Sequence, residues 1–132
     1  MIAQTLADPA GGLVWGLAAT SLVGLPVYAH RVRGRAYAIF GLVILLLSLP
    51  GALLMHARIV DWLPLRAVPF AHAAFAYSMA AAGVHLFSLV RARLRPALFR
   101  LAISVPGMAF IAAGALSGLW LLALLPLRAL LQ

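Results

Sequence analysis

The chain contains no cysteine, no glutamate and no lysine, and its only acidic residues are Asp8 and Asp61. The absence of cysteine excludes disulfides, thiolate metal sites, CxxC redox chemistry and cysteine nucleophiles. Two carboxylates and no lysine leave very little material for carboxylate dyads, lysine Schiff bases or carboxylate cages for cations. Phosphate-binding loops, dinucleotide fingerprints and nucleophile elbows are also missing from the sequence. These absences favour a protein that is not an enzyme.

What the chain does contain is mostly apolar. Of its 132 residues 66% are hydrophobic and 9% are charged, and the mean hydropathy is +1.11. Soluble domains are about half apolar and about a quarter charged, so a soluble fold of this size could not cover so much apolar surface. Long apolar runs without a two-residue alternation predict transmembrane helices rather than strands of a barrel.

Four apolar stretches approach the ~20 residues that a transmembrane helix needs. They span residues 11–29, 36–55, 68–90 and 101–125, and none contains a charged side chain. We therefore predict an all-α membrane protein, with residues 1–132 forming one integral membrane domain of four transmembrane helices in an up-and-down bundle. Because residues 1–10 carry no basic residue and the first apolar run is long enough to span, we expect the first helix to be retained rather than cleaved as a signal peptide.

The ten basic residues are all arginine, a usage that fits a GC-rich bacterial genome. Seven of them lie in the first and third connections, namely Arg31, Arg33, Arg35, Arg91, Arg93, Arg95 and Arg100. The opposite side carries Arg58, Arg66, Arg128 and both aspartates. The positive-inside rule then places the two arginine-rich connections in the cytoplasm and both termini outside it, in a bacterial inner membrane.

Other residues agree with this orientation. Trp15, Trp62 and Trp120 mark the predicted outer boundary and Tyr28 and Tyr37 the inner one, as expected for side chains that prefer the headgroup region. The arginines flank apolar spans instead of forming a stripe on a soluble surface. We therefore expect the lipid bilayer, and not a nucleic acid, to be their partner.

Small residues and prolines predict how the helices pack. Gly12 with Gly16, and Gly114 with Gly118, form two GxxxG patterns that allow close approach of helix backbones. Pro50 and Pro106 each remove one helical hydrogen bond and predict kinks. Each proline lies in an SxPG pattern, and each pattern follows an arginine turn, VRGR or VRAR. This recurrence suggests two similar helical hairpins, with chance recurrence of short patterns as the alternative.

The four histidines fall into two pairs at matching predicted depth, His30 with His85 and His56 with His72. A b-type haem held by two neutral imidazoles needs such a pair on two helices, so both pairs are candidate haem ligands. Four short helices with histidines near their ends are loosely similar to small b-type cytochrome membrane subunits, and the arginine turns to membrane anchors of some bacterial enzymes, without a diagnostic motif for either. The alternative is that the histidines make ordinary interfacial or interhelical hydrogen bonds.

Two further groupings involve these histidines. His85 shares a predicted helix face with Ser78 and Ser88, which suits packing, a proton relay or a small ligand site. His56, Asp61 and His72 could gather at the outer side as a metal or catalytic set, but their spacing matches no strong motif and we expect no metal.

The leading functional hypothesis is a small structural, anchoring or accessory subunit of the inner membrane. It would act through helix contacts with its own copies or with another membrane protein, and it would require no cofactor. One alternative is an electron-transfer subunit that binds haem b. A second alternative is a small transporter or lipid-binding protein that uses the proline-kinked helices and the polar face around His85.

Overall fold

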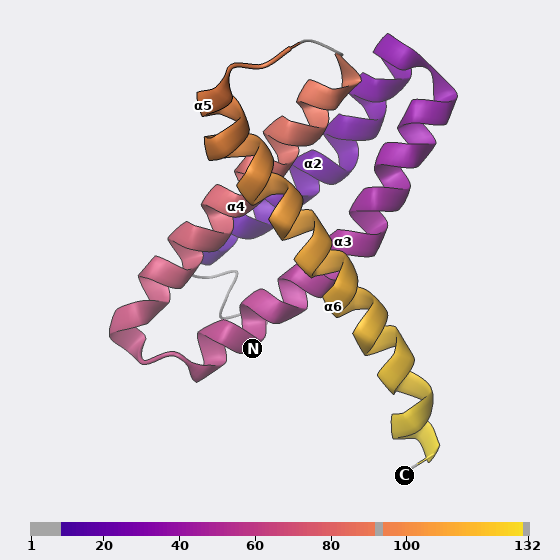
Figure 1. The fold of residues 1–132 in the computed structure, drawn as a ribbon. Coiled ribbons are helices and arrows are strands. Elements are labelled where there is room, and N and C mark those ends of the chain that lie inside the picture. Colours follow the sequence, from indigo (N-terminus) through magenta and orange to yellow (C-terminus); the bar gives the residue numbers. More distant parts are fainter. Residues whose placement is uncertain (1–8, 92–93, 131–132) are drawn as a thin grey trace.

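The computed structural model describes residues 9–91 and 94–130. Its elements, in order, are α2 (Pro9–Arg33), α3 (Arg35–Trp62), η1 (Leu65–Ala67), α4 (Val68–Val90), α5 (Ala97–Phe99), η2 (Arg100–Ser104) and α6 (Val105–Leu130). Four helices are long and apolar enough to cross a membrane, and the described part of the chain contains no strand. The prediction of an all-α, four-helix membrane protein is confirmed (Figure 1).

The helices are longer than three of the four predicted spans. The span 68–90 coincides with α4, whereas α3 continues to Trp62, well past residue 55. The predicted span ended at residue 55, just before His56, whereas His56 lies inside the helix. Residues 56–62 contain neither proline nor glycine, so nothing in them interrupts the helix. The helix ends when Leu63 becomes extended (φ −81°, ψ 145°), as a residue before a proline is expected to do.

A single glycine forms the junction of α2 and α3. Gly34 has φ 89° and ψ −176°, a region of backbone conformation that is essentially restricted to glycine. Its N–H donates to the carbonyl of His30 at 3.0 Å, which closes the end of α2. The predicted connection over residues 30–35 is thus a one-residue turn, and Arg31, Arg33 and Arg35 lie in the helices on either side of it.

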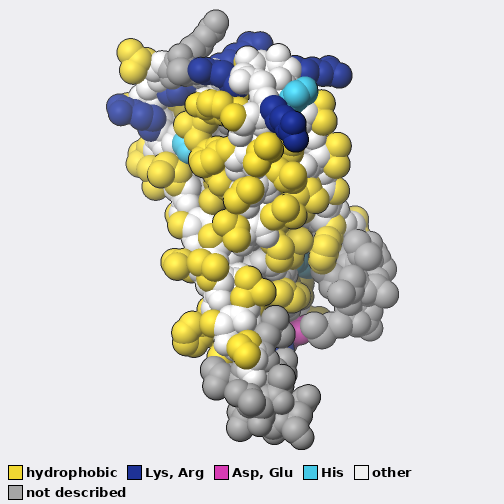
Figure 2. Space-filling view, turned by 90° about the vertical axis from the view of Figure 1, so that its right-hand side faces the viewer, with side chains coloured by type: hydrophobic (Ala, Val, Ile, Leu, Met, Phe, Trp, Pro, Cys, Tyr) yellow, Lys and Arg dark blue, Asp and Glu magenta, His cyan; other side chains and the backbone are white. Residues whose placement is uncertain are grey.

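Both arginine-rich connections lie at one end of the bundle, which we call the arginine end. Figure 2 shows their side chains gathered there above an apolar body. One of these arginines has a structural role: Nε of Arg33 donates to the carbonyl of Val90 at 2.8 Å and so joins the end of α2 to the end of α4. Arg93 and Asp8 lie outside the described residues, as does the side chain of Arg128. The cytoplasmic location of this end stays a prediction.

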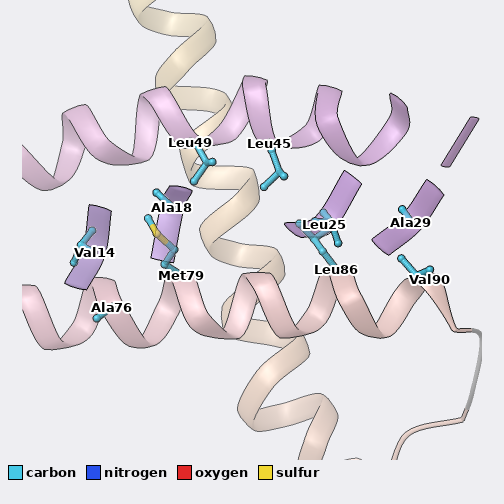
Figure 3. Packing of buried hydrophobic residues seen from close by; sticks show 10 residues of the cluster. All are labelled: Val14, Ala18, Leu25, Ala29, Leu45, Leu49, Ala76, Met79, Leu86 and Val90. Carbon is cyan, nitrogen blue, oxygen red and sulfur yellow. The ribbon is translucent and has the colours of Figure 1, made fainter. Parts of the chain in front are cut away.

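The apolar core lies where α2, α3 and α4 meet. Figure 3 shows the side chains of α2 between the other two helices. The cluster consists of Val14, Ala18, Leu25, Ala29, Leu45, Leu49, Ala76, Met79, Leu86 and Val90. Most of these side chains are small or branched aliphatics, which allows the three helices to approach closely.

Helix α6 crosses the other helices obliquely and touches them through glycine backbones (Figures 1 and 3). A Cβ at Gly107 would lie 2.8 Å from the carbonyl oxygen of Ala81 in α4, and a Cβ at Gly118 would lie 2.9 Å from that of Leu47 in α3. A Cβ at Gly51 would overlap the carbonyl oxygen of Gly114 and the nitrogen of Gly118. Real Cβ atoms essentially never come this close, so the crossing requires glycine at these positions.

The GxxxG pattern of α2, formed by Gly12 and Gly16, does not lie at the crossing with α6. Gly16 of α2 is exposed, and a Cβ there would meet nothing within 4 Å, so it makes no close helix contact within the described residues. Gly12 is half-buried. Gly16, with the exposed Ala19 and Thr20 beside it, therefore remains open to lipid or to another protein.

Pro106 changes the start of α6. It lacks an N–H, so the carbonyl of Ala102 cannot receive its usual helical hydrogen bond. The hydroxyl of Tyr77, on α4, donates to that carbonyl instead. Just before the proline, η2 forms a π turn in which the N–H of Val105 donates to the carbonyl of Arg100. Pro50, in contrast, lies within α3, and Figure 1 shows this helix changing direction along its length.

We expect Tyr77→Phe to lower the free energy of unfolding by about 1 kcal/mol, since interhelical hydrogen bonds in membranes average ~0.6 and reach ~1.7 kcal/mol. The lost hydroxyl leaves the Ala102 carbonyl without its donor in an apolar solvent. Unfolding in mixed micelles with increasing dodecyl sulfate, followed by circular dichroism, measures the change. Tyr37→Phe, which removes the hydroxyl of a tyrosine at the arginine end, is the control. Equal stability of the two variants would contradict this role for Tyr77.

Candidate functional site

His56 and His72 form a buried pair between α3 and α4. Nε2 of His56 lies 2.9 Å from Nδ1 of His72, within hydrogen-bond distance, and the side chains are 1% and 3% exposed. The Phe75 ring packs on His56 with ring centroids 4.8 Å apart, and Phe110 of α6 packs on Phe75 at 6.0 Å. Of the two facing nitrogens one must donate and the other must accept. The contact therefore gives one ring nitrogen of each histidine a hydrogen-bond partner, although aromatic and aliphatic side chains surround the pair.

This geometry does not fit a haem held by His56 and His72. An imidazole nitrogen lies roughly 2 Å from the metal it binds, so two nitrogens facing each other across one ion are about 4 Å apart. A direct contact of 2.9 Å leaves no space for an ion and a macrocycle between the rings. Asp61 is exposed near the end of α3, and it does not complete a set of three metal-ligating side chains with the pair within the described residues.

His30 and His85 differ in their surroundings. His30 is exposed at the end of α2, whereas His85 is only 8% exposed within α4. Nδ1 of His85 is buried, and no described residue gives it a hydrogen-bond partner. Ser88, which was predicted to share its face, donates its hydroxyl to the backbone carbonyl of His85 at 2.7 Å and so does not satisfy the ring. Ser78 is half-buried on the same helix.

The His85 ring borders a cavity of about 560 Å³ at the arginine end. Residues of α4, η2 and the start of α6, together with Leu94 and Arg95, border this space, which we call the arginine-end cavity. Its polar lining consists of His85, Ser88, Arg91, Arg95, Arg100 and Ser104, and apolar side chains of α4, the connection and α6 complete it. The fold thus brings three of the seven predicted topology arginines together with His85 and Ser88 of α4.

Two of the three arginines of this cavity lie over aromatic rings. The guanidinium of Arg91 lies over Tyr28 at 5.9 Å from the ring centroid, and that of Arg95 lies over Phe99 at 5.3 Å. Nε of Arg95 is buried and has no hydrogen-bond partner among residues 9–91 and 94–130. Asp61, the one acidic side chain among the described residues, is at the opposite end of the bundle. The cavity is therefore strongly positive, and two of its lining residues have a buried nitrogen without a hydrogen-bond partner in the described part of the chain.

Comparisons with protein-family models, with curated proteins and with solved structures found no match to this chain. The four membrane-crossing helices establish a membrane protein whose apolar helices contact lipid. Proposals about its function therefore rest on the geometry of the helix bundle itself.

The second cavity is an apolar groove between α3 and α6, which we call the α3–α6 groove. It has a volume of about 880 Å³ and lies toward the end opposite the arginines. Leucines and Trp120 line its walls, Gly51 and Gly118 lie along it, and Arg58 is its one charged residue. The hydroxyl of Ser117 donates to the carbonyl of Ala113 at 2.8 Å, so its proton is already engaged.

Sequence reasoning identified the histidines and arginines but missed how they combine. The connection over residues 91–100 had no signal beyond its charge, and the π turn that positions Arg100 and Ser104 has no recognisable sequence pattern. Pro106 was the available signal, because a proline frees a carbonyl one turn earlier and disturbs the helix there. Tyr77 was the other available signal, because it lies in the middle of α4 and away from both membrane boundaries.

Proposed function

We propose that the protein is a small accessory subunit of the membrane that assembles through helix contacts at the α3–α6 groove. The observation that carries this proposal is the incomplete packing of α6. In its most apolar 18-residue stretch 11% of the residues are buried, against 28% to 33% in the other three spans. Between this helix and α3 lies the apolar groove, which continues from the close glycine contact of the two helices. Such a surface allows a further helix to approach closely.

The occupant that we propose is α2 of a second copy of the chain. Gly16, Ala19 and Thr20 are exposed on α2 and form a small-residue face. The hydroxyl of Thr20 already donates to the carbonyl of Gly16 at 2.7 Å, so the face presents little unsatisfied polarity. Both this face and the groove lie in the half of the bundle away from the arginine end. Helices at matching depth can meet when two copies stand side by side in the same orientation.

This contact would be heterologous, because it joins two different surfaces of the same chain. Contacts of this kind generate closed rings or open arrays of subunits. The proposed role is therefore that of a repeating or scaffolding membrane subunit. The haem-binding alternative is not retained for the His56/His72 pair, since the two rings contact each other directly.

Disulfide cross-linking tests the contact cleanly, because the natural chain has no cysteine. Two differently tagged copies, one carrying Gly16→Cys and the other Ser117→Cys, are co-expressed and oxidised in native membranes. We expect a strong band of mixed dimers. Replacing Ser117→Cys by Ala74→Cys, which lies on the exposed face of α4, is the matched control and should give little cross-linking.

A second measurement separates assembly from chance collision. Single-molecule photobleaching of the labelled wild-type chain in bilayers should count more than one copy per spot at low protein density. Monomers in that experiment, together with equal cross-linking at Ser117→Cys and Ala74→Cys, would overturn the proposal.

A further inference from the structure

Two residues that line the arginine-end cavity each have a buried nitrogen without a hydrogen-bond partner among the described residues. These are Nδ1 of His85, whose side chain is 8% exposed, and Nε of Arg95. Leaving a buried polar atom unpaired is costly, and buried polar groups are normally satisfied by protein, water or ligand. Both atoms belong to residues of the same cavity, although they come from α4 and from the connection after it. Their common location indicates one missing partner that accepts hydrogen bonds.

The charge of the cavity identifies the chemistry of that partner. Arg91, Arg95 and Arg100 contribute three guanidinium groups, and the described residues place no carboxylate near them. Guanidinium groups bind phosphate oxygens through paired N–H donors, more strongly than neutral donors do. An anion with several acceptor oxygens would satisfy these arginines together with the His85 ring.

The surroundings of the cavity fit a lipid that carries such an anion. The cavity lies at the end of the transmembrane bundle, where lipid headgroups are found, and leucine, valine and methionine side chains complete its lining. Its volume of about 560 Å³ exceeds what a free phosphate ion needs. The π turn η2 supplies Arg100 and Ser104 to the lining, and such turns are frequent at functional sites.

We propose that the arginine-end cavity binds a phosphate group, that of an anionic phospholipid, with the His85 ring and three arginines as its ligands. This site is independent of the assembly contact proposed above, because it lies at the other end of the bundle and shares no residue with the α3–α6 groove. Headgroup and acyl chains occupy different parts of the site: the phosphate meets the guanidinium groups and His85, and the chains leave along the apolar residues of α6.

Native mass spectrometry of the purified full chain tests the proposal. The probes are dioleoyl phosphatidic acid, dioleoyl phosphatidylcholine and inorganic phosphate. We expect phosphatidic acid to form discrete one-to-one adducts at concentrations where phosphatidylcholine does not. If inorganic phosphate binds with the same dependence on the cavity residues while phosphatidic acid does not, the phosphate site stands and its source is the free ion.

Matched arginine variants separate a site from diffuse charge attraction. Arg100→Gln removes a cavity arginine, and Arg31→Gln removes an exposed arginine at the same end that does not line the cavity. Arg100→Gln should weaken phosphatidic acid binding about tenfold, which corresponds to the loss of one charge-assisted contact. Arg31→Gln should leave the affinity nearly unchanged. Equal losses in the two variants would overturn the proposal.

His85→Leu gives a second readout that a purely structural role would not produce. Leucine has a similar size and removes the unsatisfied nitrogen, so the lipid-free protein in detergent should melt at the same temperature as the wild type or higher. Phosphatidic acid should bind about tenfold more weakly to this variant. A lower melting temperature with unchanged lipid affinity would show that His85 serves packing and would contradict the proposal.

Discussion

Gly51→Ala is expected to lower the free energy of unfolding by about 3 kcal/mol or more, at the upper end of what overpacking a core usually costs. The added methyl group would overlap the carbonyl oxygen of Gly114 and the backbone nitrogen of Gly118. Backbone atoms cannot move aside as a flexible side chain can, so α3 and α6 would have to separate. Dodecyl sulfate titration followed by circular dichroism, together with the elution profile in mild detergent, measures the loss.

Gly16→Ala makes the same chemical change on α2, where the new methyl group meets nothing within 4 Å. This control should be as stable as the wild type or slightly more stable, because alanine is the better helix former. If Gly51→Ala and Gly16→Ala were equally stable, the close crossing of α3 and α6 would be wrong.

His56→Ala is expected to cost about 3 kcal/mol, within the range of ~2 to ~5 kcal/mol measured when large buried side chains are truncated. His56 is one of the two largest fully buried side chains, and it packs against both His72 and Phe75. Its truncation opens a cavity between α3 and α4 and removes the hydrogen bond. His30→Ala, at an exposed position on α2, is the matched control and should have little effect.

A double-mutant cycle isolates the hydrogen bond from the packing. The coupling between His56→Ala and His72→Ala should be about 1 kcal/mol, comparable with other interhelical hydrogen bonds in membranes. Additive effects of the two substitutions would mean that the rings do not interact. If His30→Ala lowered the free energy of unfolding as much as His56→Ala does, the burial of His56 would not explain the effect of its truncation.

The histidines show how much of the site can be predicted from residue spacing in the sequence. Matching depth correctly suggested that His56 and His72 are neighbours, because depth follows from counting residues along a helix. Whether two imidazoles hold a metal or each other depends on a difference of about 1 Å between ring nitrogens. That distance is decided by the crossing of α3 and α4, which the sequence pattern does not specify. The other suggested pair separated, since His30 is exposed and His85 borders the arginine-end cavity.

Glycine spacing predicts the packing of the helices only to the same extent. Gly114 and Gly118 were suggested as a packing surface from their spacing alone, and in the structure they contact α3. Gly51, which completes the contact, stands in no GxxxG pattern. Gly12 and Gly16 have the same spacing as the α6 pair, yet Gly16 faces away from the rest of the bundle. A spacing pattern describes one helix, whereas a contact needs a partner of suitable shape on another.

Four membrane-crossing helices, their approximate limits and the accumulation of arginine at one end were determined by the sequence itself. Hydropathy and charge act residue by residue on the preference for lipid or water, so they can be read locally. Only the tertiary structure decided the oblique crossing of α6, the direct contact of His56 with His72 and the collection of three arginines around His85. Each of these depends on backbones that approach each other from distant parts of the chain.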